Sequence, residues 1–213
     1  MRISVSDIAD AVESGLKRAL GRRDIEQAVY GLDSLDEVAL HPFIQESLKN
    51  EGYGVFREQR YPADRRKRSQ SEGERCDFVV TPDNLPLARP DAAVTLFDPI
   101  NAVELADGFW LEVKVVSQFG VQGPNRNYAP SLLSTVRQDV MKLSKDNGIL
   151  HAGLLLVLFV RDAAVADHDL CVWQDRCLKR SLPIGAPARR TVSITDRHGN
   201  GACAIAVYPV CHL

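Results

Sequence analysis

The sequence has no excess of positive charge. Its 213 residues include 26 Lys and Arg against 28 Asp and Glu, which gives a formal net charge of -2. A protein that coats nucleic acid without sequence preference is usually strongly basic, so this composition argues against that class. Any contact with nucleic acid therefore has to come from a local basic patch.

The sequence also lacks long apolar runs and paired cysteines. The longest apolar run, residues 153–160, has the length of a strand and is too short for a transmembrane helix. Residues 1–7 lack the charged-then-apolar layout of a signal peptide. The five cysteines are odd in number and include no CxxC pair, which argues against a disulfide framework and a structural zinc site. We expect a cytoplasmic protein without membrane contact.

Helical and strand patterns alternate along the chain, which is typical of an α/β domain with a mixed sheet. We expect one domain over residues 1–213, with a core over about 35–160 and a β-rich C-terminal extension over 165–213. Apolar spacing predicts helices over 5–20, 35–50 and 131–145, strands over 55–61, 76–81, 109–116 and 154–160, and a terminal hairpin over 191–207.

Two of the predicted strands carry charged residues within apolar runs. Asp77 lies in the strand 76–81, and Glu112 and Lys114 lie in the strand 109–116. Side chains alternate between the faces of a strand, so Glu112 and Lys114 share a face. Carboxylates are ligands that magnesium and manganese prefer, and such ions promote hydrolysis of phosphate esters. A strand with one solvated face shows the same alternation, so the pattern alone leaves both interpretations open.

The order of these elements resembles the PD-(D/E)XK nuclease superfamily, which has the restriction endonuclease-like fold. The resemblance spans about residues 35–160 and covers the early helix, the Asp77 strand, the Glu112-Val113-Lys114 strand and the helix after it. The two acids are 112 − 77 = 35 residues apart because of an insertion, and Cys76 stands where the superfamily has proline. The resemblance implies a three-layer α/β/α fold around a central mixed sheet.

The resemblance also implies roles for the motif residues. Asp77 and Glu112 would bind Mg²⁺ or Mn²⁺, with the backbone carbonyl of Val113 as a further ligand. Lys114 would orient or activate the attacking water and stabilise developing charge. The implied function is a metal-dependent endo- or exonuclease that hydrolyses phosphodiester bonds in DNA. The alternatives are a module that kept the fold, lost turnover and binds nucleic acid or a protein partner, and a different fold in which Lys114 is a structural charge.

The superfamily often adds a carboxylate from the early helix, and two residues here are candidates. Glu37 and His41 are four residues apart and therefore share a helix face. Glu37 can instead complete a capping box that begins at Ser34, and His41 can be an ordinary half-buried histidine. Glu46 lies off the apolar stripe and is the poorer candidate.

Two more features are candidates for contact with substrate. On the later helix, Gln138 and Lys142 are four residues apart and can face the site, although charged helix faces are usually solvated. A nuclease that cuts a palindromic site would also need a homodimer. The only concentrated basic segment, either a phosphate contact or a solvated loop, precedes the Asp77 strand and consists of Arg65, Arg66, Lys67 and Arg68.

Overall fold

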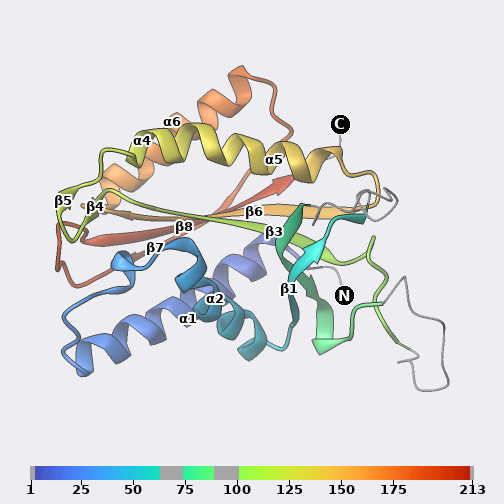
Figure 1. Ribbon diagram of the computed structural model, residues 1–213, viewed down its shortest axis with the longest axis horizontal. Helices are drawn as coiled ribbons and strands as arrows, with labels where there is room; N and C mark the ends of the chain where they lie inside the picture. Colours follow the sequence, from blue (N-terminus) through green and yellow to red (C-terminus); the bar gives the residue numbers. More distant parts are fainter. Residues whose placement is uncertain (1–2, 63–73, 89–100, 212–213) are drawn as a thin grey trace.

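The longest apolar run forms the centre of the sheet. It lies within strand β6 (His151–Val160), which pairs with a neighbour on each side (Figure 1). Every residue of β6 except His151 is buried, because helices cover both faces of the sheet. The computed structural model describes residues 3–62, 74–88 and 101–211. The prediction of a central strand buried on both faces is confirmed.

The six-stranded sheet is mixed, as predicted for an α/β chain. Its strand order is β1-β2-β3-β6-β8-β7, and β3 and β6 are the only parallel neighbours. The chain passes from β3 to β6 through a helix, because parallel neighbours need a crossover connection. The other strands are β1 (Gly54–Arg60), β2 (Arg75–Thr81), β3 (Phe109–Ser117), β7 (Ala188–Ser193) and β8 (Ala202–Val210).

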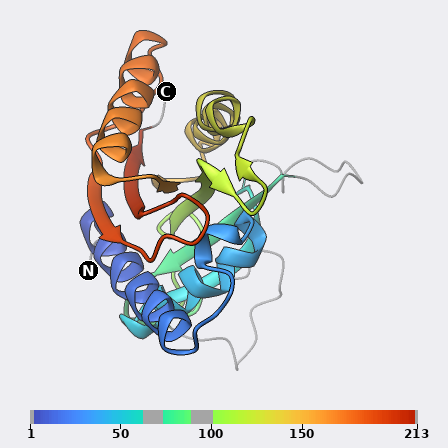
Figure 2. The ribbon, with the colours of Figure 1, turned by 90° about the vertical axis from the view of Figure 1, so that its left-hand side faces the viewer.

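Helices form a layer on each side of the sheet. Helices α1 (Val5–Ile25) and α2 (Glu37–Asn50) cover one face, and α5 (Val136–Lys145) and α6 (Ala163–Lys179) cover the other (Figure 2). No helix in the described part of the chain is long and apolar enough to cross a membrane. The short elements are η1 (Leu32–Ser34), η2 (Pro82–Asn84), the two-strand ribbon β4 (Phe119–Gly120) and β5 (Gly123–Pro124), α4 (Tyr128–Pro130) and the π-helical η3 (Ser131–Thr135).

Alternate residues of the central strands contribute to two separate apolar cores. In β6, Leu155 packs in the core under α1 and α2, whereas Leu154 packs in the core under α5 and α6. In β3, Val113 packs in the core under α1 and α2, and Trp110 packs in the core under α5 and α6. The strand alternation predicted from the sequence therefore places Glu112 on the α5 side of the sheet.

Helix α1 begins at Val5 and α2 ends at Asn50, as predicted, but α1 ends five residues later and α2 begins two residues later than predicted. Helix α1 continues past Gly21, and its N-cap is Ser4, which forms a capping box with Asp7. Helix α2 has Asp36 as its N-cap, and the Asp36 side chain accepts a hydrogen bond from the N–H of Ala39. Because Asp36 supplies the cap, the capping-box interpretation of Glu37 is wrong.

The C-terminal segment belongs to the main sheet. Residues 165–213 are not simply β-rich, because α6 occupies the first part of this segment. Strand β8 pairs with β6 along nine residues, and β7 pairs with β8 to complete the sheet. The terminal hairpin predicted over residues 191–207 is confirmed. All five cysteines are free, which agrees with the expected absence of a disulfide framework.

The close packing of α1 on α2 gives a test of this architecture. A Cβ atom added at Gly15 would lie 1.6 Å from Ser47 Oγ and 3.0 Å from Ser47 Cα, so Gly15→Ala would force the helices apart. We expect a loss of about 1–3 kcal/mol in the free energy of unfolding, measured with urea. Gly21→Ala is the matched control, because nothing lies within 4 Å of its added Cβ. It should stabilise the protein by up to about 1 kcal/mol. Equal effects of the two substitutions would contradict this packing.

Candidate metal centre

Strands β2 and β3 separate before β3 ends, and side chains then satisfy the backbone of β3. The ladder between the strands ends at Leu111, although β3 continues for six more residues. The next two N–H groups on the β2 side of β3 belong to Val113 and Val115, because these groups alternate in direction. Asp77 Oδ2 accepts a hydrogen bond from Val113 N–H at 2.8 Å, and Glu37 Oε2 accepts one from Val115 N–H at 3.3 Å. The N–H groups of β3 that have no partner on β2 thus bring two carboxylates together.

His41 joins these two carboxylates from the second turn of α2. One ligand atom from each of Glu37, His41 and Asp77 lies within 4.8 Å of the other two. The His41 side chain is 3% exposed, and neither ring nitrogen has a hydrogen-bond partner among the described residues. Its Nε2 lies 3.9 Å from Asp77 Oδ1. Buried polar atoms are rarely left unpaired, so this ring is suited to be a ligand. The sequence left Glu37 and His41 as alternatives, and the structure brings both to Asp77.

Lys114 connects helix α2 to helix α5 through two ion pairs. Its Nζ lies 2.9 Å from Glu37 Oε2 and 3.2 Å from Glu37 Oε1, and 3.8 Å from Asp139 Oδ2. Burial by itself lowers the pKa of Lys114, but the hydrogen bond and charge of Glu37, followed by the charges of Asp139 and Asp77, outweigh it and raise the pKa. Lys114 therefore carries a full positive charge at neutral pH.

Glu112 is buried beside the cluster and is bound to a tyrosine. Tyr61 donates a hydrogen bond of 2.5 Å to Glu112 Oε1, and the Tyr61 ring stacks on Trp110. Burial is the main cause that raises the pKa of Glu112 well above its usual range, and the charge of Asp77 raises it further. The hydrogen bond from Tyr61 opposes this shift. The interpretation of Glu112 as a solvated surface residue is wrong, because only 5% of the residue is exposed.

The backbone carbonyl of Val113 lies on the same side of β3 as Asp77. In an extended strand, the N–H and C=O of one residue point the same way, and the N–H of Val113 reaches the Asp77 carboxylate. This carbonyl therefore faces the space between β2 and β3, next to the three clustered side chains. Asp77, Glu112 and Val113, the three ligands implied by the sequence resemblance, thus lie at one place, with Glu112 turned toward Tyr61.

On helix α5, the residue that reaches the site is Asp139 and not the predicted Gln138. Gln138 is exposed, and the structure does not bring it into the cluster. Asp139 is 7% exposed, and its Oδ1 lies 3.5 Å from Lys142 Nζ. Burial raises the pKa of Asp139, although the charges of Lys114 and Lys142 oppose this. The sequence contained a signal for this residue, because Asp139 interrupts the apolar stripe formed by Val136, Val140 and Leu143.

The N-terminal end of α2 is held by residues from distant parts of the chain. Asn200, in the connection between β7 and β8, donates hydrogen bonds to Asp33 Oδ2 and to the backbone carbonyl of Phe119, both at 2.9 Å. Ser117, the last residue of β3, donates one of 3.0 Å to the backbone carbonyl of Asp33. These contacts fix the chain four residues before Glu37 and so help to set its position.

The predicted phosphate contacts Arg65, Arg66, Lys67 and Arg68 lie outside the described residues. The strand ends on either side of this segment are described. Arg60 of β1 pairs with Arg75 of β2, and Arg75 lies two residues before Asp77. The described strand ends that flank the basic segment in the sequence therefore lie close to Asp77.

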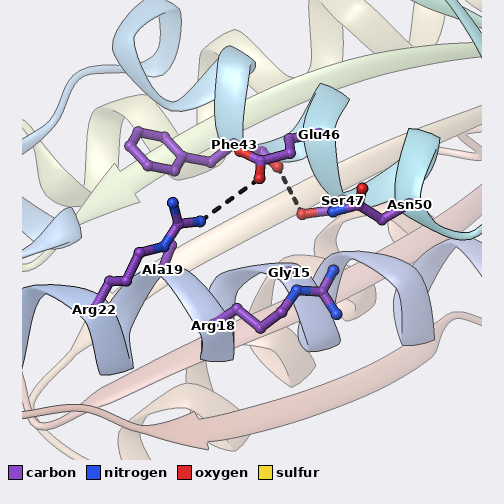
Figure 3. Close-up of a pocket in the computed structure, with 8 residues that line it drawn as sticks. All are labelled: Gly15, Arg18, Ala19, Arg22, Phe43, Glu46, Ser47 and Asn50. Carbon is purple, nitrogen blue, oxygen red and sulfur yellow. Dashed lines mark hydrogen bonds and ion pairs between the residues drawn. The ribbon is translucent and has the colours of Figure 1, made fainter.

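A second polar groove lies between α1 and α2, near the C-terminal half of α2. It has room for about one water molecule, and its lining includes Arg18, Arg22, Ser47 and Asn50 (Figure 3). Arg22 forms an ion pair of 3.6 Å with Glu46 across this groove. Glu46 therefore does not take part in the cluster at the other end of α2, as its position off the apolar stripe predicted.

Comparisons with known proteins return no match. No protein-family model, no curated protein and no solved structure matches this chain. Any function therefore has to be argued from the cluster and the fold around it.

The raised pKa of Glu112 predicts how stability depends on pH in the metal-free protein. The folded state holds the Glu112 proton more tightly than the unfolded chain, so ionisation of Glu112 destabilises the folded state as pH rises above 4.5. Glu112→Gln removes this penalty and keeps an oxygen that can accept from Tyr61. We expect the variant to be more stable than wild type at pH 8 and nearly equal to it at pH 4.

Urea unfolding in the presence of a chelator measures this difference. Glu46→Gln is the matched control, because it changes a carboxylate in an exposed ion pair, and its effect should stay below about 1 kcal/mol at each pH. A Glu112→Gln protein that is less stable than wild type at pH 8 would show that Glu112 is ionised and stabilising there.

Proposed function

We propose that this protein is a divalent-metal-dependent nuclease that hydrolyses phosphodiester bonds in DNA, with a restriction endonuclease-like fold. The observation that carries the proposal is the convergence of Glu37, His41 and Asp77 within 4.8 Å, with the Lys114 ammonium group held against Glu37. Ligands for a cation and a fixed positive charge beside them are what phosphodiester hydrolysis requires.

The order and direction of the elements support the proposed fold. From α2 to β6 the chain forms a helix, three antiparallel strands, a helix on the opposite face and a strand parallel to the third. This is the order on which the sequence resemblance was based. The candidate residues lie where the second and third strands of this unit separate.

The residues of the cluster fit a hard divalent cation. Glu37 and Asp77 offer carboxylate oxygens, Val113 a carbonyl, and His41 a buried imidazole whose nitrogens have no partner among the described residues. Oxygen donors suit Mg²⁺ and Mn²⁺, and an added imidazole is better accepted by Mn²⁺. When bound, such an ion neutralises phosphate charge and lowers the pKa of water.

Lys114 supplies a fixed positive charge in this proposal. In the metal-free protein the pKa of Lys114 is raised, chiefly by the hydrogen bond and charge of Glu37, which favours a cationic role toward the attacking water over that of a base. Its role is to orient that water and to stabilise the negative charge that develops on the phosphate. In the metal-free protein, Glu37 and Asp139 hold its ammonium group in place.

DNA as the substrate is supported by the location of the basic residues. Arg57, Arg60 and Arg75 lie on β1 and β2 near Asp77, and Arg65 to Arg68 come between these two strands in the sequence. Because the net charge of the chain is only -2, this end of the sheet would supply most of the attraction for phosphate.

One observation favours the alternative, a module with this fold that binds nucleic acid or a protein without cleaving it. The Glu112 carboxylate accepts a hydrogen bond from Tyr61 and interacts with Asp77, but it is not one of the three clustered ligands. Within the described residues, Lys114 forms its ion pairs with Glu37 and Asp139 and none with Asp77. Binding of Mn²⁺ to the isolated protein separates the two, since the inactive module would bind none.

Cleavage assays with plasmid, linear duplex and single-stranded DNA and with RNA test the proposal. With Mg²⁺ or Mn²⁺ we expect DNA products with 5′-phosphate and 3′-hydroxyl ends, and no products with a chelator. Asp77→Asn, Glu37→Gln and Glu112→Ala should each lower the rate at least about 100-fold, because each removes a candidate ligand.

Glu46→Gln is the matched control for Glu37→Gln, because both change a glutamate of α2. It should retain the wild-type rate, since Glu46 lies in a separate groove. Unchanged cleavage by Glu112→Ala and Asp77→Asn would assign the activity to another site and refute the proposal.

A further inference from the structure

The ion pair between Lys114 and Glu37 competes with the use of Glu37 as a ligand. Both Glu37 oxygens contact Lys114 Nζ, at 2.9 and 3.2 Å, and Oε2 also accepts from Val115 N–H. A cation bound by a Glu37 oxygen would lie next to Lys114 Nζ and would repel it from Glu37. Lys114 would then stand beside another positive charge, with a side chain that is only 16% exposed and has little access to water.

Asp139 offers a second partner for Lys114 at the same place. Its Oδ2 lies 3.8 Å from Lys114 Nζ, is buried and makes no hydrogen bond within the described part of the chain. A shift of about 1 Å would bring this pair to the distance of a charge-assisted hydrogen bond. Asp139 extends from α5, on the face of the sheet opposite α2, so it can hold Lys114 without contacting Glu37. The other Asp139 oxygen lies 3.5 Å from Lys142, which helps to fix the carboxylate.

We propose that Asp139 is a positioning residue that takes Lys114 from Glu37 when a divalent cation binds, so that Lys114 stays in place in the loaded site. This inference rests on the proposed function, because it requires that Glu37 binds a cation. Asp139 acts through Lys114 and does not contact the cation. Asp139 Oδ2, which accepts no hydrogen bond within the described residues, is the acceptor that Lys114 uses after it leaves Glu37.

A double-mutant cycle on cation affinity tests this inference without nucleic acid. The dissociation constant for Mn²⁺ is measured by calorimetry for wild type, Asp139→Asn, Lys114→Met and the double variant. Asp139→Asn should weaken binding about tenfold, because Lys114 then loses its second partner and keeps Glu37. Lys114→Met alone should tighten binding, because no ion pair has to be broken. In the Lys114→Met background, Asp139→Asn should change the affinity by less than about threefold.

Other outcomes of the cycle overturn the inference in distinguishable ways. If Asp139→Asn weakens binding equally with and without Lys114, Asp139 acts on the cation as a ligand or a nearby charge, and the metal site itself stands. If Asp139→Asn changes nothing in wild type, Lys114 has no need of Asp139. If wild-type protein binds no Mn²⁺, the proposed function fails, and this inference fails with it.

A second measurement checks the transfer without any cation. Glu37→Gln removes the charged partner of Lys114, so Lys114 should then depend on Asp139. The melting temperature should fall more in Glu37→Gln/Asp139→Asn than the sum of the two single losses. Asp175→Asn is the matched control, because Asp175 forms an exposed pair with Lys179 on α6. It should affect neither the melting temperature of the Glu37→Gln protein nor the affinity for Mn²⁺. Strictly additive losses would show that Asp139 cannot take Lys114 over.

Discussion

The candidate site depends on one constraint: the backbone N–H groups of β3 need hydrogen-bond acceptors beyond the point where its pairing with β2 ends. Unpaired N–H groups in a protein interior are costly, so the N–H groups of Val113 and Val115 require acceptors. The side chains of Asp77 and Glu37 provide them. The hydrogen bonds that complete the strand therefore also bring two carboxylates from β2 and α2 to the same edge. A cluster of acids that would otherwise repel one another is held together by the backbone.

Electrostatics then set what this edge can bind. The site contains more acidic than basic groups. The ammonium groups of Lys114 and Lys142 lie near four carboxyl groups, those of Glu37, Asp77, Glu112 and Asp139. Burial and mutual repulsion raise the pKa of Glu112, because a second negative charge next to Asp77 is unfavourable in a medium with little water. A divalent cation would relieve the same repulsion that the Glu112 proton relieves. Cation binding and protonation of Glu112 are therefore expected to oppose each other.

The parts of the chain outside the motif strands position the site. Helix α2 carries two of the clustered residues, and its start is tied to the C-terminal hairpin through Asp33 and Asn200. Close contact at Gly15 sets how α1 packs beside α2 on the same face of the sheet. The C-terminal segment also buries the central strand on its second edge through β8. The positions of the clustered residues consequently depend on the whole sheet and on both helical layers more than on the short motif.

The sequence by itself determined the alternation of elements, the buried central strand and the common face of Glu112 and Lys114, because helical and strand periodicity are local properties. It could not determine which residues of α2 and α5 reach β3, since that depends on helix packing and on where β2 departs. Only the tertiary structure therefore joined both Glu37 and His41 to Asp77, placed Asp139 and not Gln138 beside Lys114, and turned Glu112 toward Tyr61. Residues far apart in the chain meet there because unsatisfied backbone groups and buried charges each require a partner.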